Sequence, residues 1–206
     1  MKHIFVITSI LFLILPSCKD DDCPPDLDSP SNTNLVTTAG SYWVYQWYDI
    51  DTSGTKTIRD DRDSVFVAGD TTIRNFEYTI YSGTELGSQQ TRFLRDSSGF
   101  IIDSRGNQIW NTNSTGEFTS SKNFDVNTTA SITNLSHSID VLGETHNAIE
   151  RITQACRVDG EPITACDTCQ TTQAYYVKSI GEVLNSTAFI GSCNKLEKRL
   201  IKYEIK

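Results

Sequence analysis

Basic residues are scarce in this chain of 206 residues. Its 18 Lys and Arg stand against 26 Asp and Glu, a formal net charge of −8 at pH 7. This balance leaves no basic stripe that could neutralise phosphates, so nucleic acid is excluded as a partner. Electrostatic docking on anionic lipid headgroups is excluded for the same reason.

Catalytic motifs are also missing. Of the 3 histidines, only His137 and His146 lie beyond the first few residues, and neither Gly-x-Ser-x-Gly nor His-Glu-x-x-His occurs. We therefore expect a protein that is not an enzyme and that needs no cofactor.

No window carries a sustained apolar stripe at helical spacing, and the only Met is Met1. Thr, Ser and Asn are abundant, and β-branched and aromatic residues supply much of the apolar content. Residues 42–48 hold five aromatics, which is a strong strand signal. In residues 71–81, Phe76, Tyr78 and Ile80 alternate with polar neighbours, as in a half-buried strand.

The predicted fold is therefore all-β and antiparallel. It would be a curved sheet, forming a partial barrel or a sandwich of about nine or ten strands. Residues 111–121 are nearly all small and polar, which predicts a mobile loop. Residues 195–202 suit a closing strand or a short helix equally well.

The first 17 residues predict a secretory signal. Lys2 precedes an apolar run that is too short, and wrongly flanked, to span a bilayer as a stable helix. The run ends in Leu15-Pro16-Ser17-Cys18, which resembles the lipobox of bacterial lipoproteins. That resemblance implies cleavage before Cys18 and a diacylglyceryl thioether on its sulfur. The lipid bilayer would then be a partner through the acyl chains.

The next residues, Lys19-Asp20-Asp21-Asp22, are acidic. They resemble the export signal that sends lipoproteins of the Bacteroidota to the outer face of the outer membrane. The resemblance implies a lipid-anchored protein at the cell surface. A periplasm-facing lipoprotein with an acidic linker is the alternative.

Composition predicts three parts of the chain. Residues 1–17 are the signal, residues 18–40 a lipidated flexible tether with three of the five prolines, and residues 41–206 a single β-domain.

Five cysteines remain besides Cys18. In an oxidising compartment disulfides are the default, and the candidates are Cys156, Cys166, Cys169 and Cys193, whose pairing stays open. The same four thiolates could instead bind zinc, and the Cys166–Cys169 spacing also occurs in redox motifs. Cys23 is the odd one out and is either free or bonded to the domain.

Two further patterns suggest binding sites. The rings of Trp43, Tyr45, Trp47 and Trp110 would face a ligand such as a glycan, or would pack in the core. Asp49, Asp51, Ser53 and Asp60 have the oxygen spacing of a calcium loop, although Asp51-Thr-Ser-Gly also suits a hairpin turn.

The segment Ala174-Tyr-Tyr-Val-Lys-Ser-Ile-Gly-Glu-Val183 resembles a strand–turn–strand near the end of many small Bacteroidota lipoproteins, whose role is undefined. Ser179 stands where those proteins have a first glycine. The resemblance implies a curved sheet similar in shape to lipocalins and lipoprotein carriers.

We therefore expect a surface lipoprotein that binds or assembles with an envelope component or a glycan. The alternative is a lipocalin-like carrier of an apolar ligand, and a small hydrolase is a weaker third hypothesis.

Overall fold

The computed structural model describes residues 35–123, 125–163, 167–189 and 191–206. The signal-like segment, Cys18, the acidic run and Cys23 therefore lie outside the described residues. The described ranges all belong to one compact unit, residues 32–206.

The described residues form an all-β, antiparallel structure, which confirms the predicted fold class. They hold twelve strands rather than nine or ten. The strands are β1 Tyr42–Ile50, β2 Lys56–Ile73, β3 Phe76–Glu85, β4 Ser88–Ser97, β5 Phe100–Asp103, β6 Gln108–Asn111, β7 Gly116–Asn123, β8 Val126–Val141, β9 Glu144–Arg157, β10 Cys169–Val177, β11 Gly181–Ala188 and β12 Lys195–Glu204.

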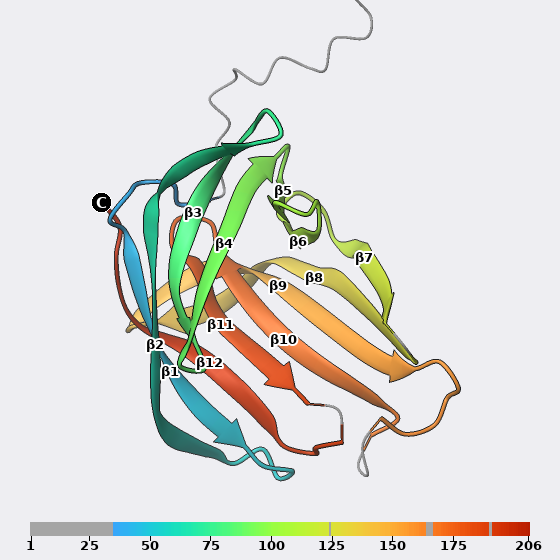
Figure 1. Cartoon of the computed structure of the whole chain (residues 1–206). Coiled ribbons are helices and arrows are strands. Elements are labelled where there is room, and N and C mark those ends of the chain that lie inside the picture. The colour runs from blue at the N-terminus through green and yellow to red at the C-terminus, as the bar shows by residue number, and fades with distance from the viewer. Residues whose placement is uncertain (1–34, 124, 164–166, 190) are drawn as a thin grey trace, which may run out of the picture. The chain divides into compact units, whose positions relative to one another are not determined.

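All twelve strands belong to one sheet in the order β6-β5-β4-β3-β2-β1-β12-β11-β10-β9-β8-β7. Two meanders, β1–β6 and β7–β12, are joined where the first strand pairs with the last. The edge strands β6 and β7 touch without pairing in the described part of the chain. The sheet is thus nearly closed into a barrel (Figure 1).

The sequence predicted a mobile loop over residues 111–121, but only part of this polar segment is a loop. Its second half belongs to β7, which pairs with β8 from Gly116↔Ile132 to Asn123↔Val126. As an edge strand, β7 has only one strand partner, so it needs few apolar residues. For residues 195–202 the sequence suited a closing strand or a short helix equally well, and the segment is part of strand β12.

Alternation along β1 decides which side chains are inside. Trp43, Tyr45 and Trp47 are 1–5% exposed and face the interior. In β3 the interior face is not the one that the apolar alternation suggested. Tyr81 and Gly83 line the interior, so Phe76, Tyr78 and Ile80 lie on the outer face, where Phe76 is 40% exposed and Tyr78 is buried beside Arg95.

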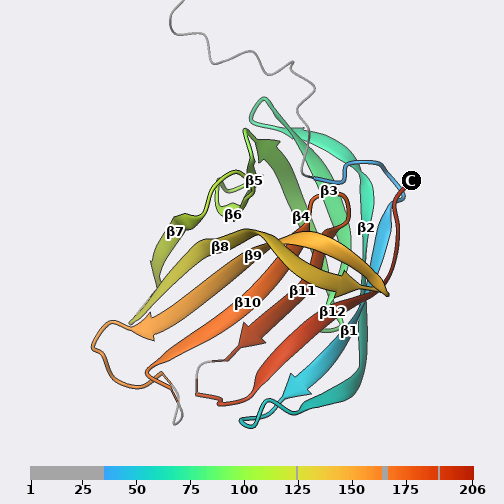
Figure 2. The ribbon, with the colours of Figure 1, turned by 180° about the vertical axis from the view of Figure 1, so that it is seen from behind.

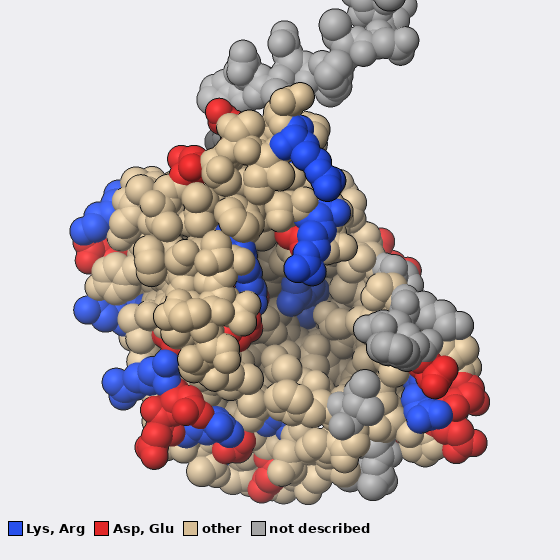
Figure 3. All heavy atoms as spheres, viewed as in Figure 1, with Lys and Arg blue, Asp and Glu red and all other residues tan. Residues whose placement is uncertain are grey.

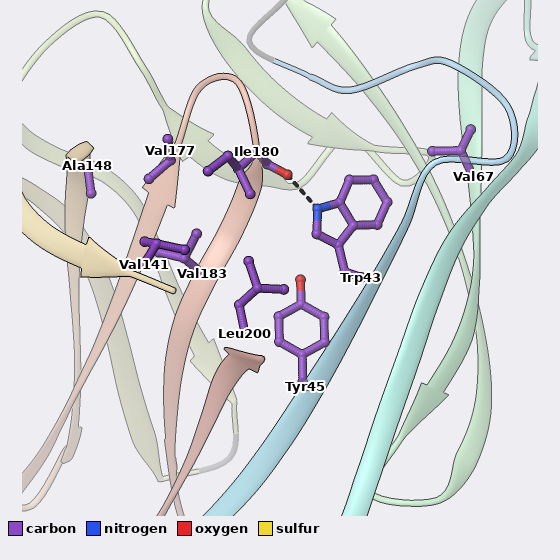
Figure 4. Packing of buried hydrophobic residues seen from close by; sticks show 9 residues of the cluster. All are labelled: Trp43, Tyr45, Val67, Val141, Ala148, Val177, Ile180, Val183 and Leu200. Carbon is purple, nitrogen blue, oxygen red and sulfur yellow. Dashed lines mark hydrogen bonds between the residues drawn. The ribbon is translucent and has the colours of Figure 1, made fainter. Parts of the chain in front are cut away.

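Two core clusters fill most of the interior. One is drawn in Figure 4, where the Trp43 indole N–H donates to the carbonyl of Ile180 at 2.5 Å. The Tyr45 hydroxyl donates to the carbonyl of Glu182 at 2.9 Å. Both bonds tie β1 to the β10–β11 turn, 137 residues further along the chain.

The long hairpin β8–β9 is part of the same sheet, and in Figure 2 its turn end passes in front of β11 and β12. Its register shifts twice, between Ile132 and His137, and these irregularities accompany the bend of the hairpin. Beyond the bend, Val141 and Ala148 join the core cluster that contains Trp43. The hairpin therefore covers one side of the interior.

Leu35 and Val36, which composition assigned to the tether, pack on the sheet, whereas residues 37–40 are exposed. Leu35 is buried in the second core cluster with Ile101 and Trp110. The Tyr81 hydroxyl donates to the carbonyl of Val36. The end of the chain lies beside this segment, because the Lys206 amide donates to the Ser41 hydroxyl (Figure 1).

Asp63 is a buried carboxylate, 1% exposed, that joins three segments. Its oxygens accept the Trp47 indole N–H at 2.6 Å and the backbone N–H groups of Leu86 and Gly87 at 2.7 and 3.2 Å. Burial alone would raise the pKa of Asp63, but these donors outweigh it and hold the pKa below its usual value.

Replacing Asp63 with Ala should lower the free energy of unfolding by about 3 kcal/mol, because the buried Trp47 indole N–H and two partly buried backbone N–H groups lose their acceptor. Urea unfolding of the whole chain measures this. Asp60→Asn, at an exposed position of the same strand, is the control and should change stability by less than about 0.5 kcal/mol.

The same carboxylate predicts a pH dependence. Because its folded-state pKa is lowered, its contribution is complete above the unfolded value of about 4 and is lost as the pH falls through the folded value. Asp63→Asn should therefore lose less stability than the natural chain between pH 5 and 2. Equal slopes would contradict this role.

Candidate functional site

A pocket opens into the concave side of the sheet between the two core clusters. The cavity volume that the centre of a water molecule can occupy is about 110 Å³. By the same measure one water needs only ~10–15 Å³. In Figure 3 the molecule is visibly hollowed on this side, with Lys and Arg atoms around the hollow. The lining residues are Leu35, Val36, Trp43, Tyr45, Val65, Tyr81, Ser82, Gly83, Thr84, Glu85, Gln90, Arg92, Leu94, Ile101, Ile109, Trp110, Tyr176, Gly181, Glu182 and Lys198.

Aromatic rings form much of the wall. Trp43 lies 5.8 Å from Tyr81, and Trp110 lies 5.2 Å from Tyr176, measured between ring centroids. Burial raises the pKa of Tyr45, Tyr81 and Tyr176, so these phenols are neutral at ordinary pH. The wall can therefore pack against an apolar body.

A row of charged side chains forms the other part of the wall. Lys198 is almost fully buried and its ammonium lies 3.0 Å from Glu182 and 3.9 Å from Glu85. Glu85 also pairs with Arg92, whose side chain is 52% exposed. The Lys198 ammonium lies 4.8 Å above the Tyr45 ring. This row links β3 and β4 to β11 and β12 along the wall of the pocket.

Glu182 keeps its negative charge in this place. Burial would raise the pKa of Glu182, but the charges of Lys198 and Arg151 and the hydrogen bond from Lys198 outweigh burial and lower it. The Asn185 amide donates to the same carboxylate at 3.0 Å. The carboxylate is thus held as an ion by its neighbours.

The four rings singled out from the sequence are all buried. They form no exposed platform on which a sugar could stack, because the inward face of β1 and the end of β6 supply the core. Trp43, Tyr45 and Trp110 line the pocket, whereas Trp47 lies outside its lining and is bonded to Asp63.

The calcium candidates are not gathered around one point. The Asp51 carboxylate accepts bonds from Ser53 and from the Thr55 amide within its own hairpin turn. Asp49 pairs with Arg59, and Asp60 is exposed on β2. Among the described residues, no three His, Cys, Asp or Glu side chains are arranged to hold a metal ion. The geometry is that of the hairpin turn.

Cys156 and Cys169 form a disulfide between directly opposed residues of β9 and β10, with Cα atoms 4.3 Å apart. Cys193 is also disulfide-bonded, and Cys166 lies outside the described residues. Cys156 and Cys169 therefore have no free thiolate that could bind zinc. The crosslink contributes about 3 kcal/mol in the chain-entropy account.

Sequence reasoning missed the charged wall of the pocket. In β12, Leu196, Lys198 and Leu200 lie on one buried face, so a lysine between two leucines at period two was the available signal. Arg92 and Glu182 carried no such signal, because their role depends on strands that are distant in the sequence.

No protein-family model and no curated protein matches the chain. Among solved structures, the chain is similar to a "putative lipoprotein" from Parabacteroides distasonis. The two are 12% identical, with a TM-score of 0.48, and the match covers 84% of this chain and 98% of that one. In the described residues, no helix is long and apolar enough to cross a membrane.

The Glu182–Lys198 pair gives a stability test. Glu182→Gln should lower the free energy of unfolding by about 3 kcal/mol, because it leaves a buried ammonium with only the more distant Glu85. Adding Lys198→Met should restore most of the loss, since Glu85 still has Arg92. Denaturant unfolding of both variants measures this, and additive losses would contradict a coupled pair.

Proposed function

We propose that the protein is a non-enzymatic, lipid-anchored carrier that holds an apolar small molecule inside its partly closed sheet. The pocket is the observation that supports this most directly. Ligand sites are concave and mostly apolar, with a few placed polar groups, and this pocket combines aromatic walls with one charged row.

The position of the pocket supports the same proposal. One core cluster contains Trp43, Tyr45 and Leu200, and the other contains Ile101, Trp110 and Tyr176. Space remains between them that their own side chains leave open. A well-packed core has few voids larger than a water molecule, so open space of this size favours an occupant.

The anchor is proposed from the sequence. The Leu15–Cys18 pattern supports acylation of Cys18, and the acidic Lys19–Asp22 run supports display at the outer membrane surface. The other expectation, contact with a glycan through exposed rings, is less well supported because the candidate rings are buried. Assembly with an envelope component remains a prediction from the anchor alone.

Filling the pocket should abolish binding of an apolar probe. The uncharged fluorophore N-phenyl-naphthylamine should bind the natural chain with a blue-shifted, enhanced emission. Val65→Trp, which places a large ring in the lining, should weaken binding at least about tenfold. Ala68→Trp, on the outer face of the same strand, is the control and should bind normally. Equal binding by both variants would place the probe elsewhere.

Membrane attachment should depend on one cysteine. In fractionated cells, Cys18→Ser should move the protein from the membrane to the soluble envelope fraction, since no acyl chain can form on serine. Cys23→Ser is the matched control and should stay in the membrane. Replacing Asp20, Asp21 and Asp22 with Ala should leave attachment intact but protect the chain from protease added to whole cells. Retention of the Cys18→Ser protein in the membrane would refute the anchor.

A further inference from the structure

Arg151 is a half-buried cation whose neighbours belong to the concave side of the sheet. Its opposed residues in the neighbouring strands, Ile132 and Ala174, belong to the core. The guanidinium lies 4.4 Å above the Trp110 ring, and Nη1 donates to the carbonyl of Ile109 at 2.8 Å. Its Nε atom is buried and has no hydrogen-bond partner among the described residues. An unpaired charged donor of this kind is costly to bury.

The other charges nearby are already engaged. Glu182 binds Lys198 at 3.0 Å, and Glu85 binds Arg92. Asp96, a further carboxylate close to Tyr176, accepts the Gly99 amide at 2.9 Å. No described carboxylate forms an ion pair with Arg151. In the described part of the chain, Arg151 is therefore met by a ring, a carbonyl and the charge of Glu182, but by no ion pair.

Arg92 and Arg151 come from β4 and β9 and lie within electrostatic reach of each other. Burial lowers the pKa of Arg151 first, and the charge of Arg92 lowers it further, against the attraction of Glu182. Arg92 lines the pocket, and Arg151 contacts two lining residues, Ile109 and Trp110. An anion bound beside Arg92 and Arg151 would relieve the repulsion between the two guanidinium groups.

We propose that the carried molecule is an amphiphile with an anionic head, a carboxylate or a phosphate. Arg151 and Arg92 hold the head, and the apolar chain lies against the aromatic wall. This inference rests on the proposed carrier function, because it names the class of ligand for the same pocket. If Arg151 served only to hold β6 against β9, it would not distinguish charged from neutral ligands.

The test compares ligands that share one chain and differ in the head. Decanoate, decyl phosphate and decanol compete with N-phenyl-naphthylamine for the whole protein. In the natural chain, at least one of the two anions should bind about tenfold more tightly than decanol. The preferred anion then shows whether the head is a carboxylate or a phosphate.

Arg151→Met keeps most of the side-chain length and removes the charge. It should weaken the preferred anion about tenfold and change decanol binding by less than about threefold. Arg92→Met, at a half-exposed side chain, gives the same test if Arg151→Met does not fold. Arg157→Met, on the same strand as Arg151 but paired with Asp159 outside the pocket, is the control.

The outcomes separate the two proposals. Fluorophore binding with no preference for an anion in the natural chain overturns the anionic head and leaves the carrier standing. Equal loss of decanoate, decyl phosphate and decanol in Arg151→Met overturns the role of Arg151 in recognising the head. Failure of the fluorophore and of all three competitors to bind the natural chain refutes the carrier itself.

Discussion

The pairing of β1 with β12 is the constraint on which the rest of the sheet depends. Strands β1–β6 and β7–β12 each form a meander whose neighbours in sequence pair with each other, and in the described residues this is the one strand pairing that joins the two meanders. Trp43 and Tyr45 reinforce the join from the inside, because their polar atoms bond to carbonyls at the start of β11. The first and the last described strand therefore support one wall, and the free edges β6 and β7 fall in the middle of the sequence.

This arrangement concentrates charge where water is scarce. Lys198 is buried because β12 lies in the middle of the sheet, and two carboxylates from different strands balance its charge. Among the described residues Arg151 has no carboxylate partner, and its guanidinium contacts the Trp110 ring and one carbonyl. A buried charge without a partner destabilises a fold more than a paired one, which is why we propose a ligand beside Arg151.

Much of the fold follows from local patterns, and the site does not. Alternation in residues 42–48 identifies β1 and its two faces, although it leaves open which face is core. In β3 the apolar alternation of Phe76 and Tyr78 points to the outer face, where Arg95 covers both rings, and the interior holds Tyr81 and a run of small and charged residues. Arg92, Glu182 and Lys198 lie along one wall of the pocket because the sheet curves. No local sequence pattern indicates this curvature. Burial of the four candidate rings follows from the same curvature.

Native mass spectrometry of the protein extracted from its own membrane tests the central claim most directly. We expect a noncovalently bound amphiphile with an anionic head. Its mass adds to that of the acylated chain, and mild activation releases it. Finding only the acylated chain, in a preparation that still binds no apolar fluorophore after delipidation, would contradict it.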